Sequence, residues 1–192
     1  MSTHITSVCH TAMSCIRNIG RLRNAVDQKT CELLFNSLVT SRIDYCNTLF
    51  WQLPLSQVNR LQKIQNICAR IVTRSRCRES ISPILKDLHW LPVAKRIRYK
   101  ILLMVYKAIM TDSSPLYLVE LFAQYSPTRA LRSAAENQLV VPKSQLKTFG
   151  DRAISHSAPY HWNKIPKPLR NVPRNNTTTF KRQLKTTLFS NK

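Results

Sequence analysis

The chain has 192 residues, and its 30 Lys and Arg against 9 Asp and Glu give a formal net charge of +21. A hydrophobic content of 43% excludes a disordered basic tail, and the charge predicts a globular protein that meets a polyanion. The acids are scattered, with Asp27 and Glu32 the closest pair, and only two glycines occur. These features argue against metal-dependent phosphoryl transfer and exclude glycine-rich nucleotide-binding loops.

Hydropathy and cysteine usage place the chain among intracellular proteins. The longest purely apolar run, 101–106, is far shorter than the roughly 20 residues that a membrane span needs. The first residues show no secretory signal pattern. All six cysteines fall within the first 77 residues, and we interpret them as reduced, mostly buried thiols. A nuclear and a cytoplasmic location both stay open.

The predicted elements of the first part are helices, because apolar residues recur there at helical spacing. Asp27 is the expected N-cap of the second helix, and Ser82 with Pro83 begins the fourth. The predicted helices span 8–24, 28 to about 46 with an extension toward Trp51, 55–74, 82–88, 93–110 and 115–125.

Beyond Pro127 the pattern becomes less regular. Two short extended segments are expected at 139–142 and 147–149, and 166–168 is expected to be irregular. Two further helices are predicted over 151–163 and 177–189. The predicted fold class is therefore mainly α, with a helical bundle over 1–112 and a basic, less regular α-rich part with short extended segments over 113–192.

The positive charge is concentrated in the last two-thirds of the chain. Residues 1–50 carry five basic and three acidic groups, residues 51–112 carry twelve and three, and residues 113–192 carry thirteen and three. Helical geometry of about 100° per residue aligns basic side chains along the third and fifth helices, and an alternating arginine triplet lies between them. The candidate nucleic-acid-binding residues are Lys63, Arg70, Arg74, Arg76, Arg78, Lys95, Arg96, Arg98, Lys100 and Lys107.

A solvated helix face is the alternative interpretation of each basic stripe taken alone. Against it stand the shortage of acids to pair with these bases and the clustering of the stripes in the sequence. Like charges crowded without a partner are destabilising. Together these features favour binding of a polyanion.

No constellation for catalysis or metal binding stands out. Two cysteines separated by two residues, the usual start of a zinc site, do not occur, and His156 and His161 are five apart, which places them on different helix faces. We therefore predict no catalytic residue, no metal and no cofactor. The tryptophans at 51, 90 and 162 each stand beside a proline-bounded turn. We expect them to pack between helices rather than to stack on nucleic-acid bases.

Several segments, in conserved order and spacing from about residue 4 to 190, resemble the C-terminal region of reverse transcriptases from LINE-type (non-LTR) retrotransposons. The matching segments are LVTSRIDYCN at 38–47, LQKIQN at 61–66 with AR at 69–70, LHWLPV at 88–93, residues 96–108, LRS at 131–133, VVP at 140–142, FGDRA at 149–153, APYHWNKIP at 158–166 and FKRQLK at 180–185.

The resemblance implies thumb helices followed by the C-terminal extension of such an RNA-directed DNA polymerase. The Tyr-x-Asp-Asp turn of the palm has no counterpart in this sequence, so no catalytic residue is carried over and no enzyme activity is expected. Thumb helices of this family hold the template–primer backbone, and the extension engages element RNA or target DNA. The charge map and the resemblance thus agree on a nucleic-acid partner.

Three hypotheses remain open at this stage. The first is a non-catalytic fragment that grips RNA, DNA or both through basic helix faces, without a membrane or small-molecule partner. The second is a helical protein-interaction module that docks on a palm-bearing polymerase chain or on itself. The third is a non-functional remnant of a truncated element. The sequence does not decide between RNA and DNA.

Overall fold

The computed structural model describes residues 1–112, 114–127, 137–144, 146 and 150–190. By its internal contacts the chain divides into two units, Met1–Arg96 and Ile97–Lys192, which are described separately. The described residues are mainly helical and contain no strand, which confirms the predicted fold class. The expected boundary was residue 112, whereas this division falls within α6 (Val93–Met110).

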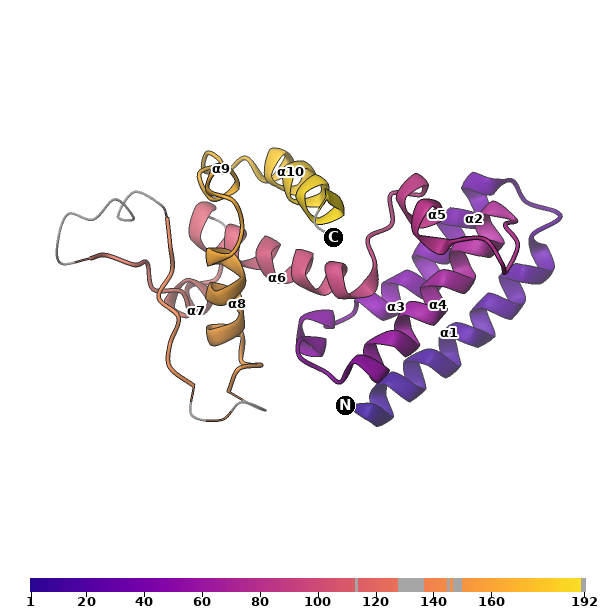
Figure 1. Ribbon diagram of the computed structural model, residues 1–192, viewed down its shortest axis with the longest axis horizontal. Coiled ribbons are helices and arrows are strands. Elements are labelled where there is room, and N and C mark those ends of the chain that lie inside the picture. Colours follow the sequence, from indigo (N-terminus) through magenta and orange to yellow (C-terminus); the bar gives the residue numbers. More distant parts are fainter. Residues whose placement is uncertain (113, 128–136, 145, 147–149, 191–192) are drawn as a thin grey trace. The chain divides into compact units, whose positions relative to one another are not determined.

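Unit 1 is a bundle of helices (Figure 1). Its two long helices, α1 (Ser2–Leu22) and α4 (Leu55–Thr73), lie side by side and run parallel. The Arg60 guanidinium donates to Thr6 Oγ1 near the start of both helices, and Arg23 Nε donates to the Ile71 carbonyl near their ends. The remaining elements are α2 (Gln28–Phe35), η1 (Asn36–Thr40), α3 (Ser41–Asp44), η2 (Asn47–Phe50) and α5 (Ile81–Asp87).

The apolar positions that predicted these helices form the core of unit 1. Each side chain of valine, leucine or isoleucine size that leaves water contributes about 1.5–3 kcal/mol to folding. The core residues on the two long helices are Ile5, Ala12, Ile16, Ile19, Leu61, Ile64, Cys68, Ala69 and Val72.

The second predicted helix is present but is not uniform. Asp27 caps it as expected, because its carboxylate accepts the backbone N–H groups of Lys29 and Thr30. The chain passes through one π-helical turn, 36–40, and stays helical to Asp44. It ends there because Tyr45 is extended and Cys46 takes a left-handed φ of 49°. The predicted continuation toward Trp51 is only the short 3-10 helix η2.

Unit 2 holds most of α6 together with α7 (Leu116–Glu120), α8 (Ile154–Asn163), α9 (Lys167–Arg170) and α10 (Thr177–Ser190). Its core combines aliphatic side chains with a cluster of aromatic rings. The rings of Tyr106 and Phe180 stack with centroids 4.1 Å apart, and Trp162 lies 6.0 Å from Phe180. The Tyr106 hydroxyl donates to the Pro173 carbonyl at 2.7 Å, which ties α6 to the loop before α10.

The less regular part follows the expectation in outline. The extended segment at 139–142 is represented by one antiparallel bridge between Gln124 and Leu139. The expected segment 147–149 lies outside the described residues. The helix predicted to 125 ends at Glu120, and the segment predicted to be irregular at 166–168 leads into α9.

The tryptophan and cysteine expectations have different outcomes. Trp90 and Trp162 are buried, which confirms their packing role, and Trp51 is half-buried. All six cysteines are free thiols. The expectation that most of them are buried is wrong, because only Cys31 and Cys68 are buried while Cys46 and Cys77 are exposed.

Candidate nucleic-acid interface

The arginine triplet predicted from the sequence lies in the loop that follows α4. Arg74 ends the helix in a left-handed conformation with φ of 55°, and its backbone N–H bonds to the Arg70 and Ile71 carbonyls. The side chains of Arg74, Arg76 and Arg78 are all exposed. The loop, residues 74–80, therefore presents three guanidinium groups within a short stretch of chain.

Arg70 fixes the shape of this loop. Its guanidinium donates to the Arg76 carbonyl at 2.5 Å and to the Glu79 carbonyl at 2.9 Å. Within the loop, the Arg76 backbone N–H donates to Glu79 Oε1 at 3.0 Å. The two bonds from Arg70 hold residues 76 and 79 to the last turn of α4, and the third bond joins these residues to each other. The loop therefore loses less conformational freedom when it binds a partner.

The end of α1 meets the end of α4 through another arginine. The Arg23 guanidinium donates to the Ile71, Val72 and Val26 carbonyls at 2.8–2.9 Å. Two of these are carbonyls of the last turn of α4, where the backbone carbonyls carry the negative end of the helix dipole. Arg74 in turn donates to the Arg23 carbonyl at 3.2 Å.

Together these contacts gather basic side chains at one end of unit 1, which we call the arginine end. It comprises Arg21, Arg23, Arg70, Arg74, Arg76 and Arg78. Burial raises the pKa of the Cys31 thiol on α2, and Arg23 and Arg74 oppose this shift, which places both guanidinium groups within electrostatic reach of α2.

Two carboxylates also lie at the arginine end, and both are engaged by backbone groups. Glu79 accepts the Arg76 N–H. The Asp27 carboxylate accepts the Thr30 N–H and the Lys29 N–H. The pKa of Asp27 is lowered mainly by the side chain of Thr30, and these two backbone N–H groups contribute less. Neither carboxylate forms an ion pair with an arginine side chain among the described residues. The guanidinium charge at this end is therefore in excess.

The structure changes the stripe predicted on the third helix. Lys63 and Arg70 lie two turns apart on α4, as expected, and Lys63 is exposed. Arg74 leaves the stripe because the helix ends at Thr73. Arg70 is half-buried, and its guanidinium donates hydrogen bonds to two carbonyls of the loop. Its role is therefore to position the loop.

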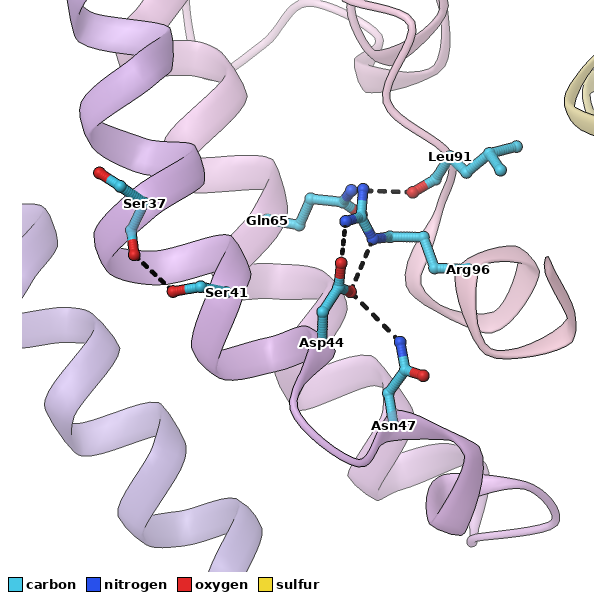
Figure 2. A network of polar contacts seen from close by, with 7 residues as sticks. All are labelled: Ser37, Ser41, Asp44, Asn47, Gln65, Leu91 and Arg96. Carbon is cyan, nitrogen blue, oxygen red and sulfur yellow. Dashed lines mark hydrogen bonds and ion pairs between the residues drawn. The ribbon is translucent and has the colours of Figure 1, made fainter. Parts of the chain in front are cut away.

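The stripe predicted on the fifth helix is also divided. Arg96 belongs to unit 1, and its guanidinium forms an ion pair with Asp44, so it is not a free phosphate contact (Figure 2). Lys95 is half-buried. Lys100 and Lys107 are exposed and lie in unit 2, where Arg98 is half-buried.

The motifs that carried the resemblance contact one another in unit 1. Gln65 donates to the Leu91 carbonyl at 2.9 Å (Figure 2). Gln62 accepts the Val93 N–H at 2.8 Å. The Trp90 indole N–H donates to Glu32 at 3.0 Å. Polar residues of the 61–66 segment thus hold the turn at 88–93, which explains why both segments have a specific sequence: they support the fold.

Sequence reasoning missed Arg21 and Arg23, because the first 50 residues are nearly neutral in sum. A signal for them was present: arginines at 17, 21 and 23 cluster where the first helix was expected to end. Cations in the last turn of a helix are favoured by its dipole. The parallel packing of α1 and α4, which brings them to the loop, is a tertiary feature that this signal does not contain.

The described part of the chain holds no group of three or more His, Cys, Asp or Glu residues that would bind a metal ion. Among the same residues, no helix is both long and apolar enough to cross a membrane. Comparisons with family models, with curated proteins and with solved structures gave no match for this chain.

Proposed function

We propose that the chain binds the phosphate backbone of RNA or DNA through the arginine end of unit 1. The observation that supports this proposal is the loop that contains Arg76 and Arg78, whose side chains are exposed. Arg70 holds this loop by hydrogen bonds to two of its backbone carbonyls. Guanidinium groups match phosphate oxygens in geometry and stay charged at every physiological pH. Contacts of this kind give affinity with little sequence preference.

The excess of cations supports this proposal over a solvated surface. A solvated face usually interleaves both signs of charge, whereas Asp27 and Glu79, the acids described at the arginine end, are bound to backbone N–H groups. Release of counterions from nucleic acid is then the main driving force for binding. If about six phosphates are neutralised, the slope of log affinity against log salt should be about −4 to −5.

The test is fluorescence anisotropy of labelled single-stranded and double-stranded RNA and DNA between 50 and 200 mM salt. The double variant Arg76→Gln with Arg78→Gln should reduce the magnitude of the salt slope by about 2. The matched control is Arg42→Gln with Lys86→Gln, which removes the same charge from exposed positions outside the arginine end. Binding that is flat with salt, or equal slopes for the two variants, would overturn the proposal.

We further infer that this fragment descends from a LINE-type reverse transcriptase and acts without an active site of its own. Two sets of contacts support this inference, one between the 61–66 and 88–93 segments and one between Asp44 of the 38–47 segment and Arg96 of the 96–108 segment. One folded unit explains why these motifs occur together. The implied role is that of thumb helices on a template–primer. Its partner chain would be a polymerase that carries the palm.

One specific observation favours the protein-interaction module as a second candidate. Large apolar side chains are exposed along the elements between α2 and α4, among them Leu33 at 68%, Tyr45 at 68% and Leu55 at 72%. Exposed apolar groups in this number suit a protein partner. Sedimentation velocity of the chain alone tests self-association, and a monodisperse monomer that also fails to bind a palm-bearing polymerase chain would exclude this candidate.

A further inference from the structure

A second cluster of cations lies in unit 2, around Tyr160 on α8. His156, Tyr160 and Lys164 are spaced four residues apart, so they share one side of the helix and its end. The segment belongs to the motif at 158–166, which the proposed function has not used. Tyr160 is 39% exposed, so the cluster is open to solvent.

The ring of Tyr160 is crowded. Lys164 Nζ lies 4.0 Å from its centroid and also donates to its hydroxyl. The His161 ring meets it edge-on with centroids 5.5 Å apart, and the His156 ring lies nearly parallel at 6.5 Å. A base has little room to stack on such a ring. What the cluster offers to a ligand is the hydroxyl and the ammonium group.

Arg98 on α6 adds a second cation. It is half-buried, and its Nε is buried without a hydrogen-bond partner in the described part of the chain. Burial lowers the pKa of Arg98, and Tyr160 opposes that shift, which places the guanidinium within electrostatic reach of the phenol. A guanidinium that is partly withdrawn from water without a counter-charge is costly.

Neither Arg98 nor Lys164 forms an ion pair with a carboxylate in the part of the chain that the structure describes. Asp151, which precedes α8 in the sequence, lies against His156, with 3.9 Å between its Oδ1 and His156 Nε2. His161 is buried, and its pKa is lowered to about 4 by burial and then by Arg98 and Lys164. The imidazole is therefore neutral at pH 7, and both cations lie near it.

We propose that Arg98, Tyr160 and Lys164 form a binding site for one phosphate group. Lys164 donates to the Tyr160 oxygen, so the phenolic O–H is left to donate to a phosphate oxygen. The guanidinium of Arg98 and the ammonium of Lys164 would supply charge-assisted donors to the same phosphate. The phosphate would supply the counter-charge that Arg98 lacks.

The phosphate group comes either from a nucleic-acid strand or from a free phosphate ion. The proposed site does not depend on the arginine end, because it uses residues of unit 2 alone. The experiment therefore treats the two sources separately and uses variants of the two surfaces side by side.

In the first arm, the full chain is titrated with inorganic phosphate at constant ionic strength, and binding is monitored by NMR of the backbone amides. We expect saturable shifts at residues 98 and 160–164. Lys164→Gln, at an exposed position that does not threaten the fold, should weaken phosphate binding about tenfold. Tyr160→Phe keeps the ring but removes the hydroxyl, and it should weaken phosphate binding severalfold. Lys181→Gln, an exposed lysine on α10, is the matched control and should leave it unchanged.

The second arm is a titration with an eight-nucleotide single strand. If the strand supplies the phosphate, Lys164→Gln weakens its binding too, and if free phosphate is the ligand, only the first arm responds. Equal phosphate affinity in the natural chain, Lys164→Gln and Lys181→Gln would overturn the site. Loss of strand binding on Arg76→Gln with Arg78→Gln reports on the arginine end alone, so failures of the two proposals are distinguishable.

Discussion

Arg96 and Asp44, which lie 52 residues apart in the sequence, form a two-point ion pair within unit 1 (Figure 2). Arg96 Nε donates to Asp44 Oδ1 at 2.9 Å, and the second guanidinium nitrogen donates to Oδ2. Asn47 donates to the same carboxylate at 3.2 Å. The pair ties the start of α6 to the end of α3, and both side chains are about four-fifths buried.

Replacing Asp44 with asparagine should lower the free energy of unfolding of unit 1 by about 2 kcal/mol. The reason is that the variant leaves the Arg96 guanidinium partly buried without its counter-charge. The value falls between those of exposed and fully buried pairs because the pair is only partly shielded from water. Urea unfolding followed by circular dichroism measures the change.

The control for this prediction is Asp87→Asn, which removes the same charge from an exposed side chain. It should change the unfolding free energy by no more than about 0.5 kcal/mol. A double-mutant cycle of Asp44→Asn with Arg96→Gln should show a coupling of about 1–2 kcal/mol. Additive effects would mean that the pair contributes nothing, and the absence of a cooperative transition in the natural chain would favour the remnant hypothesis.

Much of the fold could be predicted from the sequence because helical periodicity is a local property. The apolar spacing of 55–74 and 177–189 gave α4 and α10 to within a residue at each end. Asp27 was recognised as a cap because its short acceptor precedes an apolar run. The π-helical turn at 36–40 was missed because it leaves the same residues helical and shifts only the hydrogen bonding.

The candidate site was predictable only in part. Exposed arginines at 76 and 78 followed from a charged, polar loop between two helices. The roles of Arg70 and Arg96 did not follow, because they depend on carbonyls and a carboxylate that the folded chain brings near. Periodicity gives the side of a helix on which a cation lies. It does not tell whether that cation meets a partner from elsewhere in the chain.

Replacing Gln65 with leucine should destabilise unit 1 by about 1–3 kcal/mol although the volume is nearly kept. Gln65 is 5% exposed and donates to the Leu91 carbonyl, so the variant leaves that carbonyl without its donor. Denaturant unfolding of Gln65→Leu measures the loss. Gln183→Leu makes the same change at an exposed position, and an equal loss there would contradict this account.

Replacing Arg70 with glutamine should loosen the loop of residues 74–80 without removing any exposed guanidinium. The two bonds to the Arg76 and Glu79 carbonyls are lost, so the loop opens more often. Limited trypsin digestion should then cut after Arg76 and Arg78 severalfold faster, with the cut sites identified by mass spectrometry.

The matched control for the loop is Lys63→Gln. Lys63 lies on the same helix, carries the same charge and is exposed. Digestion of this variant should proceed as in the natural chain. Unchanged rates for Arg70→Gln, or equal acceleration by both variants, would show that Arg70 does not hold the loop.

Acid should destabilise unit 2 through His161. Burial, Arg98 and Lys164 lower the pKa of this imidazole to about 4 in the folded chain, against about 6.5 when unfolded. Between these values the unfolded chain binds more protons, so the free energy of unfolding falls as the pH drops from about 6.5 to about 4. The full contribution, present above pH 6.5, is about 3 kcal/mol.

The measurement is the pH dependence of urea unfolding for the natural chain and for His161→Gln, which cannot gain the proton. The variant should lose the part of the acid slope that lies between pH 6.5 and 4, whereas His10→Gln, at an exposed position, should keep it. The slope for one such group reaches at most about 1.4 kcal/mol per pH unit, which denaturant titration resolves. Identical slopes in all three chains would show that His161 takes up its proton without cost in the folded state.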